Sequence, residues 1–114
     1  MAAEVRILFE GYLSRPDAGD GVASTVGLAR EDGVVVVIDP GMVPGQDAIL
    51  GPLAEMEIGP DAVTDVVLSH HHPDHTLNAG LFPLARVHDH WAWYRGDQWI
   101  DREAEGFELA PSIR

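Results

Sequence analysis

The most constraining feature of the sequence is a run of five consecutive β-branched residues, Val34–Ile38. Residues of this type favour a β-strand, and an unbroken apolar run predicts a strand that is buried on both faces. Before the run, Glu31-Asp32-Gly33 is typical of a tight turn, because glycine tolerates a positive φ. A second strand is expected over 22–29, so the pattern predicts a hairpin that opens the domain.

The rest of the chain alternates between strand and helix patterns. Apolar alternation predicts a first strand over Val5–Leu13, with Ile7, Phe9 and Leu13 on one face. Residues 46–58 change to a helical period, with a proline that either kinks the helix or delays its start. The remaining expected elements are short, namely strands over Val66–Leu68, Ala85–His88 and Phe107–Leu109 and a helix over Thr76–Leu81. This order predicts an α/β fold with a mixed sheet.

The composition limits the number of domains and the classes of partner. A chain of 114 residues allows one domain, and 46% hydrophobic residues are enough for a core. The formal charge of −12 counts against nucleic acid or an anionic membrane as a partner, although a local basic patch stays open. No segment reaches the roughly 20 apolar residues of a membrane span, and the N-terminus lacks a signal-peptide pattern. We therefore expect a cytoplasmic protein.

Four of the six histidines fall within the segment Ser69–His75, which reads Ser-His-His-His-Pro-Asp-His and contains the pattern His-x-His-x-Asp-His. The chain has no cysteine, so a metal ion would be held by imidazole and carboxylate groups. A single histidine is more often structural, but a cluster interleaved with aspartate after a buried strand favours metal binding.

The spacing of the cluster predicts how the side chains divide. In an extended chain, residues two apart point the same way, so His70 and His72 can converge on one ion. The proline that follows bends the chain, so Asp74 and His75 face a neighbouring position. His71 points the other way and is expected to lie outside the site. One loop can thus offer two ligands to each of two metal ions.

This segment resembles the signature loop of the metallo-β-lactamase superfamily, a group of αββα metallohydrolases. Two further stretches are similar to the family pattern: the strand Val34–Gly41, which ends in Asp-x-Gly, and residues 78–83 with His88 after them. The resemblance covers nearly the whole chain but only part of the family fold. It implies the N-terminal half of an αββα metallo-β-lactamase-like sandwich, an α/β fold with a mixed sheet.

The resemblance also implies roles for the loop residues. It assigns His70 and His72 to a first metal ion, and Asp74 and His75 to a second. Two zinc ions are expected, with iron or manganese as alternatives. They would lower the pKa of a bridging water and polarise a carbonyl or phosphoryl oxygen. Asp74 would have a catalytic role as well, by orienting the resulting hydroxide.

Several residues near the loop are candidates for supporting roles. Asp39 and Ser69 are expected to hold imidazoles in the correct tautomer. For Asp39, a loop cap after a strand explains the residue equally well. Trp91, Trp93 and Tyr94 either line a substrate cleft or pack in the core.

The ligands that complete the family's two sites have no counterpart in this sequence. The chain has no Gly-His-Thr motif and no histidine beyond His90, whereas catalytic zinc typically has three protein ligands. Three explanations stay open. The single metallo-β-lactamase-like domain over 1–114 is truncated at its C-terminus, a partner chain supplies the rest, or His88 and His90 act as substitute ligands.

Two classes of function fit these observations. The first is a metal-dependent hydrolase of a small-molecule substrate, an ester, thioester or lactone, in the style of glyoxalase II. A metallo-β-lactamase-type endoribonuclease is the alternative enzyme, and the acidic charge counts against it. The second class is a catalytically incomplete metal-binding fragment. A homodimer would cover a sheet face that half of a sandwich leaves exposed.

Overall fold

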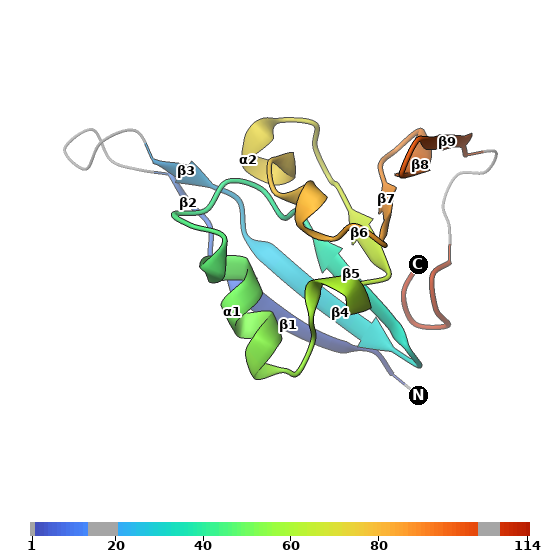
Figure 1. The fold of residues 1–114 in the computed structure, drawn as a ribbon, viewed down its shortest axis with the longest axis horizontal. Coiled ribbons are helices and arrows are strands. Elements are labelled where there is room, and N and C mark those ends of the chain that lie inside the picture. Colours follow the sequence, from blue (N-terminus) through green and yellow to red (C-terminus); the bar gives the residue numbers. More distant parts are fainter. Residues whose placement is uncertain (1, 14–20, 103–107) are drawn as a thin grey trace.

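The computed structural model describes residues 2–13, 21–102 and 108–114 of the chain. They form a seven-stranded sheet in the order β1-β4-β5-β6-β7-β8-β9 and a separate pair, β2 and β3 (Figure 1). The strands are β1 (Glu4–Phe9), β2 (Tyr12–Leu13), β3 (Val22–Ala23), β4 (Val26–Glu31), β5 (Val34–Ile38), β6 (Asp65–Val67), β7 (Arg86–His88), β8 (Ala92–Arg95) and β9 (Gln98–Asp101). The helices are α1 (Asp47–Glu55), η2 (Pro60–Ala62), α2 (Pro73–Thr76) and η3 (Ala79–Leu81).

The large sheet is mixed, which confirms the expected α/β class. Strands β1, β4 and β5 pair antiparallel, β5, β6 and β7 pair parallel, and β7, β8 and β9 pair antiparallel. The β-branched run is β5, an interior strand between β4 and β6, as predicted. Its turn from β4 places Asp32 at φ 50° and Gly33 at φ 85°. The parallel strands β5 and β6 therefore end at the same edge, which carries the histidine segment.

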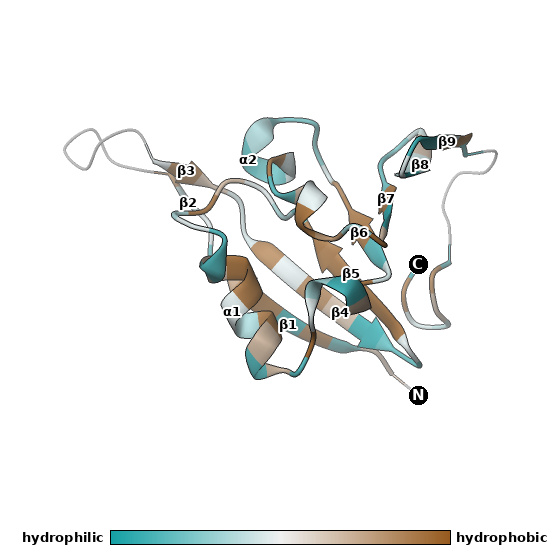
Figure 2. Ribbon diagram, viewed as in Figure 1, coloured by the Kyte–Doolittle hydropathy of each residue, from teal (hydrophilic) through white to brown (hydrophobic). Residues whose placement is uncertain are grey.

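Helix α1 covers one face of the sheet. The helix continues through Pro52, and its Ile49 and Leu53 side chains are fully buried. Figure 2 shows apolar residues both in α1 and in the strands of the sheet. The core under the helix contains Leu8, Val26, Leu28, Val37, Ile49, Leu53, Ile58, Val63, Val66, Phe82 and Ala85. No helix in the described ranges is both long enough and apolar enough to span a membrane.

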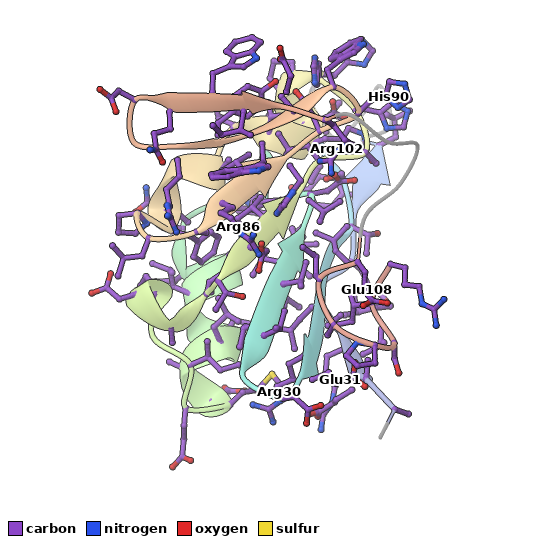
Figure 3. The ribbon with its side chains drawn as sticks, turned by 90° about the vertical axis from the view of Figure 1, so that its right-hand side faces the viewer. Arg30, Glu31, Arg86, His90, Arg102 and Glu108 are labelled. Atoms are coloured by element: carbon purple, nitrogen blue, oxygen red, sulfur yellow. The ribbon has the colours of Figure 1, made fainter. Side chains whose placement is uncertain are left out.

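The opposite face of the sheet is only partly covered. Residues 108–114 lie beside β4 and β5 (Figure 3). Leu109 and Ile113 line a small cavity together with Val36, Ile38 and Val67. The backbone N–H of Ser112 donates a hydrogen bond to Glu31 Oε1 over 2.7 Å.

The expected first strand is divided, and its predicted face is wrong. The pairing of β1 with β4 shifts register between Ile7 and Phe9. Leu8 is buried, whereas Ile7 is 64% exposed and Leu13 is 77% exposed. A β-bulge reverses the alternation of side chains, so the simple period of two assigns these residues to the wrong face.

Three further elements differ from expectation. Strands β8 and β9 form a hairpin that the sequence analysis missed, with Gly96 in the turn at φ 62°. The expected helix over 76–81 is replaced by α2, which ends at Thr76, and by η3. Of the expected last strand, Phe107 lies outside the described residues, and Leu109 belongs to no strand.

Candidate metal centre

The histidine segment lies where two parallel strands end. After β6 the chain passes through Leu68 and Ser69 into the three histidines, and α2 begins at Pro73. The neighbouring strand β5 ends at Ile38, so Asp39 follows it directly. The backbone N–H of Asp39 donates to Val67 O over 2.9 Å, which holds the two strand ends together. Carboxyl ends of adjacent parallel strands are a common place for functional side chains.

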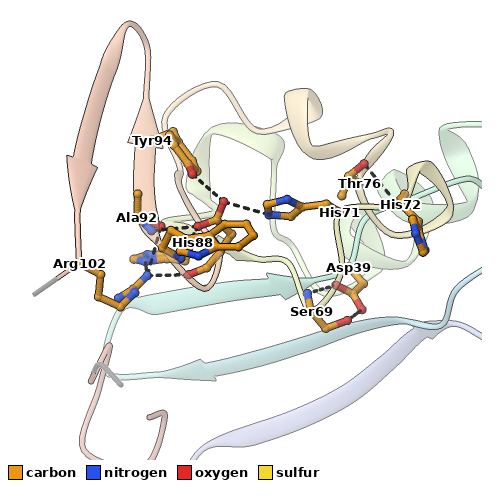
Figure 4. A network of polar contacts seen from close by, with 11 residues as sticks. Asp39, Ser69, His71, His72, Thr76, His88, Ala92, Tyr94 and Arg102 are labelled. Carbon is orange, nitrogen blue, oxygen red and sulfur yellow. Dashed lines mark hydrogen bonds and ion pairs between the residues drawn. The ribbon is translucent and has the colours of Figure 1, made fainter. Parts of the chain in front are cut away.

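The buried Asp39 carboxylate is the hub of this edge. Its Oδ1 accepts a hydrogen bond from the Ser69 backbone N–H over 2.7 Å, and its Oδ2 accepts one from Ser69 Oγ over 2.5 Å (Figure 4). The same Oδ2 lies 2.9 Å from His75 Nδ1. Asp39 has φ 54°, a left-handed conformation that aspartate adopts more readily than most residues. One carboxylate thus connects the start and the end of the loop.

The hydrogen bonds assign the tautomers of two imidazoles. His75 Nδ1 faces a carboxylate oxygen, so it carries the proton and donates it. His70 Nδ1 lies 3.0 Å from Ser69 Oγ, whose own proton is donated to Asp39, so His70 Nδ1 is a donor as well. In a neutral imidazole a proton on Nδ1 leaves Nε2 as the acceptor, so both rings have the tautomer that can bind a metal ion through Nε2.

The four predicted ligands lie near one another. The ring centroids of His70 and His75 are 4.6 Å apart, and those of His70 and His72 are 6.4 Å apart. His75 Nε2 lies 3.4 Å from Asp74 Oδ2. Two donors bound to one tetrahedral zinc ion at about 2.0–2.1 Å would lie about 3.3 Å apart. The donor chemistry and the spacing of this pair therefore fit a divalent metal ion.

The donors meet in pairs and not in larger sets. Within the described ranges, no group of three His, Asp or Glu side chains is arranged to hold an ion. His70 and His72 are exposed, while Asp74 and His75 are partly buried. A loop that offers two ligands to each ion was the expectation from the sequence, and the assignment of each ligand stays a prediction.

A close backbone contact supports the loop from below. The Asp74 carbonyl oxygen accepts hydrogen bonds from the N–H groups of Ser24 and Met42, each over 3.3 Å. A Cβ atom on Gly41 would lie 1.8 Å from that same oxygen. Asn78 Nδ2 donates to Gly41 O over 2.7 Å. The Gly41 position therefore requires glycine, because the loop backbone approaches it directly. The sequence analysis did not predict the backbone hydrogen bond from Ser24 to the loop.

The two candidate substitute ligands lie in different surroundings. His88 is buried in β7, and its Nε2 lies 2.7 Å from Asp65 Oδ1. Its Nδ1 lies 3.4 Å from Arg102 Nη2, so both ring nitrogens have protein partners. His90 is exposed, with its ring 5.8 Å from that of Trp91. A role for His88 as a metal ligand would break its bond to Asp65, and this role, like that of His90, stays a prediction.

The aromatic residues after β7 divide between packing and exposure. Arg86 and Arg95 each lie 5.8 Å from the Trp93 ring, which indicates cation–π packing. Tyr94 donates its hydroxyl proton to Asp89 over 2.6 Å. Trp91 is 60% exposed, so of the three residues it is the one that presents most of its surface to solvent.

The comparisons with known proteins agree with this geometry. Residues 19–110 match the sequence model of the metallo-β-lactamase superfamily. The chain belongs to the metallo-β-lactamase superfamily. This match confirms the family that the histidine segment predicts. The fold is also confirmed as part of a metallo-β-lactamase-like structure.

Two curated relatives share the name metallo-β-lactamase domain-containing protein 1. The rat protein is 41% identical over 72 residues, which are 61% of this chain and 28% of the relative. The human protein is 44% identical over 52 residues, which are 46% of this chain and 20% of the relative. The chain thus spans less than a third of the length of either relative.

Solved structures of other proteins superpose on this chain. A metallo-β-lactamase-type protein of Thermotoga maritima superposes with a TM-score of 0.67 at 32% identity, covering 76% of this chain and 42% of that one. YhfI of Bacillus subtilis has a TM-score of 0.54 at 20% identity, over 77% of this chain and 36% of that one. The chemotaxis sensor ODP, solved with a peroxy diiron species, has a TM-score of 0.54 at 16% identity, over 80% and 34%. The latter two show the fold alone.

Proposed function

We propose that this chain carries the metal-binding loop of a metal-dependent hydrolase that acts on a small ester, thioester or lactone. The observation that carries the proposal is the pair of imidazoles, His70 and His75, whose Nδ1 atoms are both engaged by the Asp39–Ser69 pair. This arrangement directs Nε2 of each ring to a metal ion, and His75 Nε2 lies 3.4 Å from Asp74 Oδ2. Imidazole held in this way by an outer carboxylate is typical of metal centres.

In this proposal His70 and His72 hold one ion, and Asp74 and His75 hold a second. When bound, such ions supply Lewis-acid chemistry, which lowers the pKa of water and polarises the oxygen of a substrate. Asp39 keeps His75 and, through Ser69, His70 in their ligating tautomers. Asp74 is the residue that we expect to act on the reacting atoms, by orienting the water. Zinc is the expected metal, with iron and manganese as the alternatives that the donor set also accepts.

A small substrate is favoured over a polyanion by the charge of the chain. The chain has nineteen acidic and seven basic residues, so few cations are available to contact phosphates. The charge does not distinguish an ester from a thioester or a lactone. A cytoplasmic location also stays a prediction.

Metal analysis is the first test. The purified chain would be measured for bound zinc, iron and manganese before and after dialysis against a chelator, alongside His72→Ala. We expect about two ions per wild-type chain and fewer in His72→Ala. His72 is exposed, so this substitution removes no core packing. Wild-type protein without bound metal, after incubation with each ion, would overturn the proposal.

A hydrolysis screen is the second test. Metal-loaded protein would be assayed with thioesters, lactones, simple esters and single-stranded RNA, again beside His72→Ala. Turnover of one of the first three substrates that is lost in the variant supports the proposal. Turnover of RNA alone would favour the endoribonuclease. No turnover in any arm, together with substoichiometric metal that a chelator removes easily, would favour the incomplete metal-binding fragment.

A further inference from the structure

His71 lies between two of the proposed ligands but points away from them. Its Nε2 is 3.0 Å from Asp89 Oδ2, on the connection between β7 and β8 (Figure 4). Its ring also meets the ring of Trp91 edge-on, with centroids 4.9 Å apart at 63°. The sequence analysis expected His71 to point out of the site, and the structure adds what it points toward.

Asp89 is a buried hydrogen-bond acceptor that its neighbours hold in place. It is 6% exposed. Its Oδ1 accepts hydrogen bonds from the backbone N–H groups of Trp91 and Ala92, over 2.8 and 2.9 Å. Its Oδ2 accepts a hydrogen bond from the Tyr94 hydroxyl over 2.6 Å and also faces His71. This is a full set of partners for one carboxylate.

The backbone of Asp89 is fixed as well. Its N–H donates to Ala92 O over 3.0 Å, and its carbonyl accepts a hydrogen bond from Arg102 Nη2 over 3.1 Å. The chain just before it, β7, lies within the sheet and pairs with β6. Asp89 is therefore fixed at the end of β7 by backbone hydrogen bonds, and the loop 69–72 can be held against it.

The protonation states of this group follow from its surroundings. Burial raises the pKa of the Asp89 carboxyl, but hydrogen bonds from Tyr94, from the backbone of Ala92 and Trp91 and from His71 outweigh it and hold that pKa below its usual value. Burial and the neighbouring Asp89 raise the pKa of Tyr94 to about 12. Asp89 accepts hydrogen bonds from Tyr94 and from two backbone N–H groups, and the contact of His71 Nε2 with Asp89 Oδ2 is one in which an imidazole N–H donates to a carboxylate oxygen.

We propose that His71 is a positioning residue. Its hydrogen bond to Asp89 ties the middle of the histidine loop to the end of β7. This bond sets the backbone from which His70 and His72 project toward one ion. The inference rests on the proposed metal-binding function. Asp39 holds the start of the loop through Ser69 and its end through His75, whereas His71 holds the part between them. Fixing a residue of the loop before binding removes an entropic cost that the metal would otherwise have to offset.

Two substitutions at His71 separate the hydrogen bond from the packing. His71→Phe keeps a ring against Trp91 but loses the donor. His71→Gln loses the ring but places an amide Nε2 donor at a similar reach. Because the His71 side chain is half exposed, neither change removes core packing. Asp61→Asn, on the exposed helix η2, is the matched surface control.

The measurement is a titration of each metal-free protein with Co²⁺, followed by its visible absorption, together with thermal unfolding of the metal-free forms. We expect Co²⁺ to bind His71→Phe about tenfold more weakly than wild type, with an altered absorption spectrum. His71→Gln should restore most of the affinity, and Asp61→Asn should match wild type. Unfolding temperatures of the metal-free proteins should agree, because the bond acts on loop geometry more than on the fold.

The outcomes distinguish this inference from the proposed function. If wild type binds Co²⁺ and His71→Phe binds it equally tightly, the positioning role is wrong while the metal centre stands. The role is also wrong if His71→Gln is as weak as His71→Phe, since the donor would then be irrelevant. Wild-type protein that binds no Co²⁺ would overturn the metal centre itself, and this inference with it.

Discussion

At the scale of single residues, Asp39 combines two demands that few side chains meet. It adopts a left-handed φ of 54°, and its carboxylate accepts from Ser69 twice and from His75. Asparagine also tolerates this backbone conformation, but its amide has only one acceptor atom. Asp39→Asn therefore tests the hydrogen bonds while it spares the backbone.

We expect Asp39→Asn to bind metal about 10- to 100-fold more weakly than wild type, because the imidazole of His75 loses its outer carboxylate. Competition with a coloured chelator measures the affinity. Circular dichroism before metal addition checks that the variant is folded. Unchanged affinity in a folded variant would leave Asp39 as a loop cap alone.

Gly41 shows how a residue without a side chain supports a site. The carbonyl oxygen of Asp74 occupies the space that a Cβ would need, at 1.8 Å. Gly41→Ala must push α2 and the loop away, which we expect to cost about 1–3 kcal/mol in the free energy of unfolding and to weaken metal binding. Gly45→Ala is the control, because a Cβ there meets nothing within 4 Å. Urea unfolding of both variants makes the comparison, and equal stabilities would contradict the close contact.

At the scale of elements, β6 and β7 are held together by more than their backbone ladder. Asp65 of β6 is 1% exposed, and its Oδ1 lies 3.0 Å from Arg86 Nε and 2.7 Å from His88 Nε2. Thr64 donates its hydroxyl proton to Oδ2 over 2.7 Å. Both β7 partners project from one face of the strand, since residues two apart in a strand share a face.

Removing the Asp65 charge should destabilise the sheet. Burial raises the pKa of the Asp65 carboxyl, but hydrogen bonds from His88 and Thr64 and the charge of Arg86 outweigh it and lower that pKa below its ordinary value. We expect Asp65→Asn to lose about 1–3 kcal/mol of unfolding free energy near neutral pH, because buried His88 loses its carboxylate acceptor and the partly exposed Arg86 loses its ion-pair partner. Urea titrations at pH 7 measure this difference, and a loss close to zero would contradict it.

The same pKa shift fixes the direction of the pH dependence. A carboxyl with a lowered folded pKa binds more protons when unfolded, so its contribution is present above its ordinary value of about 3.9 and is lost as the pH falls through the folded pKa. Wild type should therefore lose stability below about pH 4, and Asp65→Asn should lose less over the same range. Identical pH profiles for the two proteins would show that Asp65 does not carry this dependence.

At the scale of the whole molecule, the charge of −12 opposes the compact state. Salt screens repulsion between exposed charges, with a Debye length of about 10 Å at 0.1 M ionic strength. We expect the unfolding temperature of the metal-free chain to rise between about 0.01 and 0.2 M salt, equally in NaCl and KCl. Differential scanning fluorimetry measures the shift. A fall in unfolding temperature would mean that attractive ion pairs dominate instead.

The sequence by itself determined the interior strand, the mixed α/β class and the family, because these depend on residues that lie close together along the chain. The run Val34–Ile38 and the segment Ser69–His75 carry that information locally. Tertiary structure decided that Ile7 and Phe9 do not share a face, since the register of β1 against β4 shifts between them. It also decided that Asp39 meets His75 and that His71 meets Asp89. Those contacts join residues 36 and 18 positions apart, and only the pairing register and packing of whole elements bring them together.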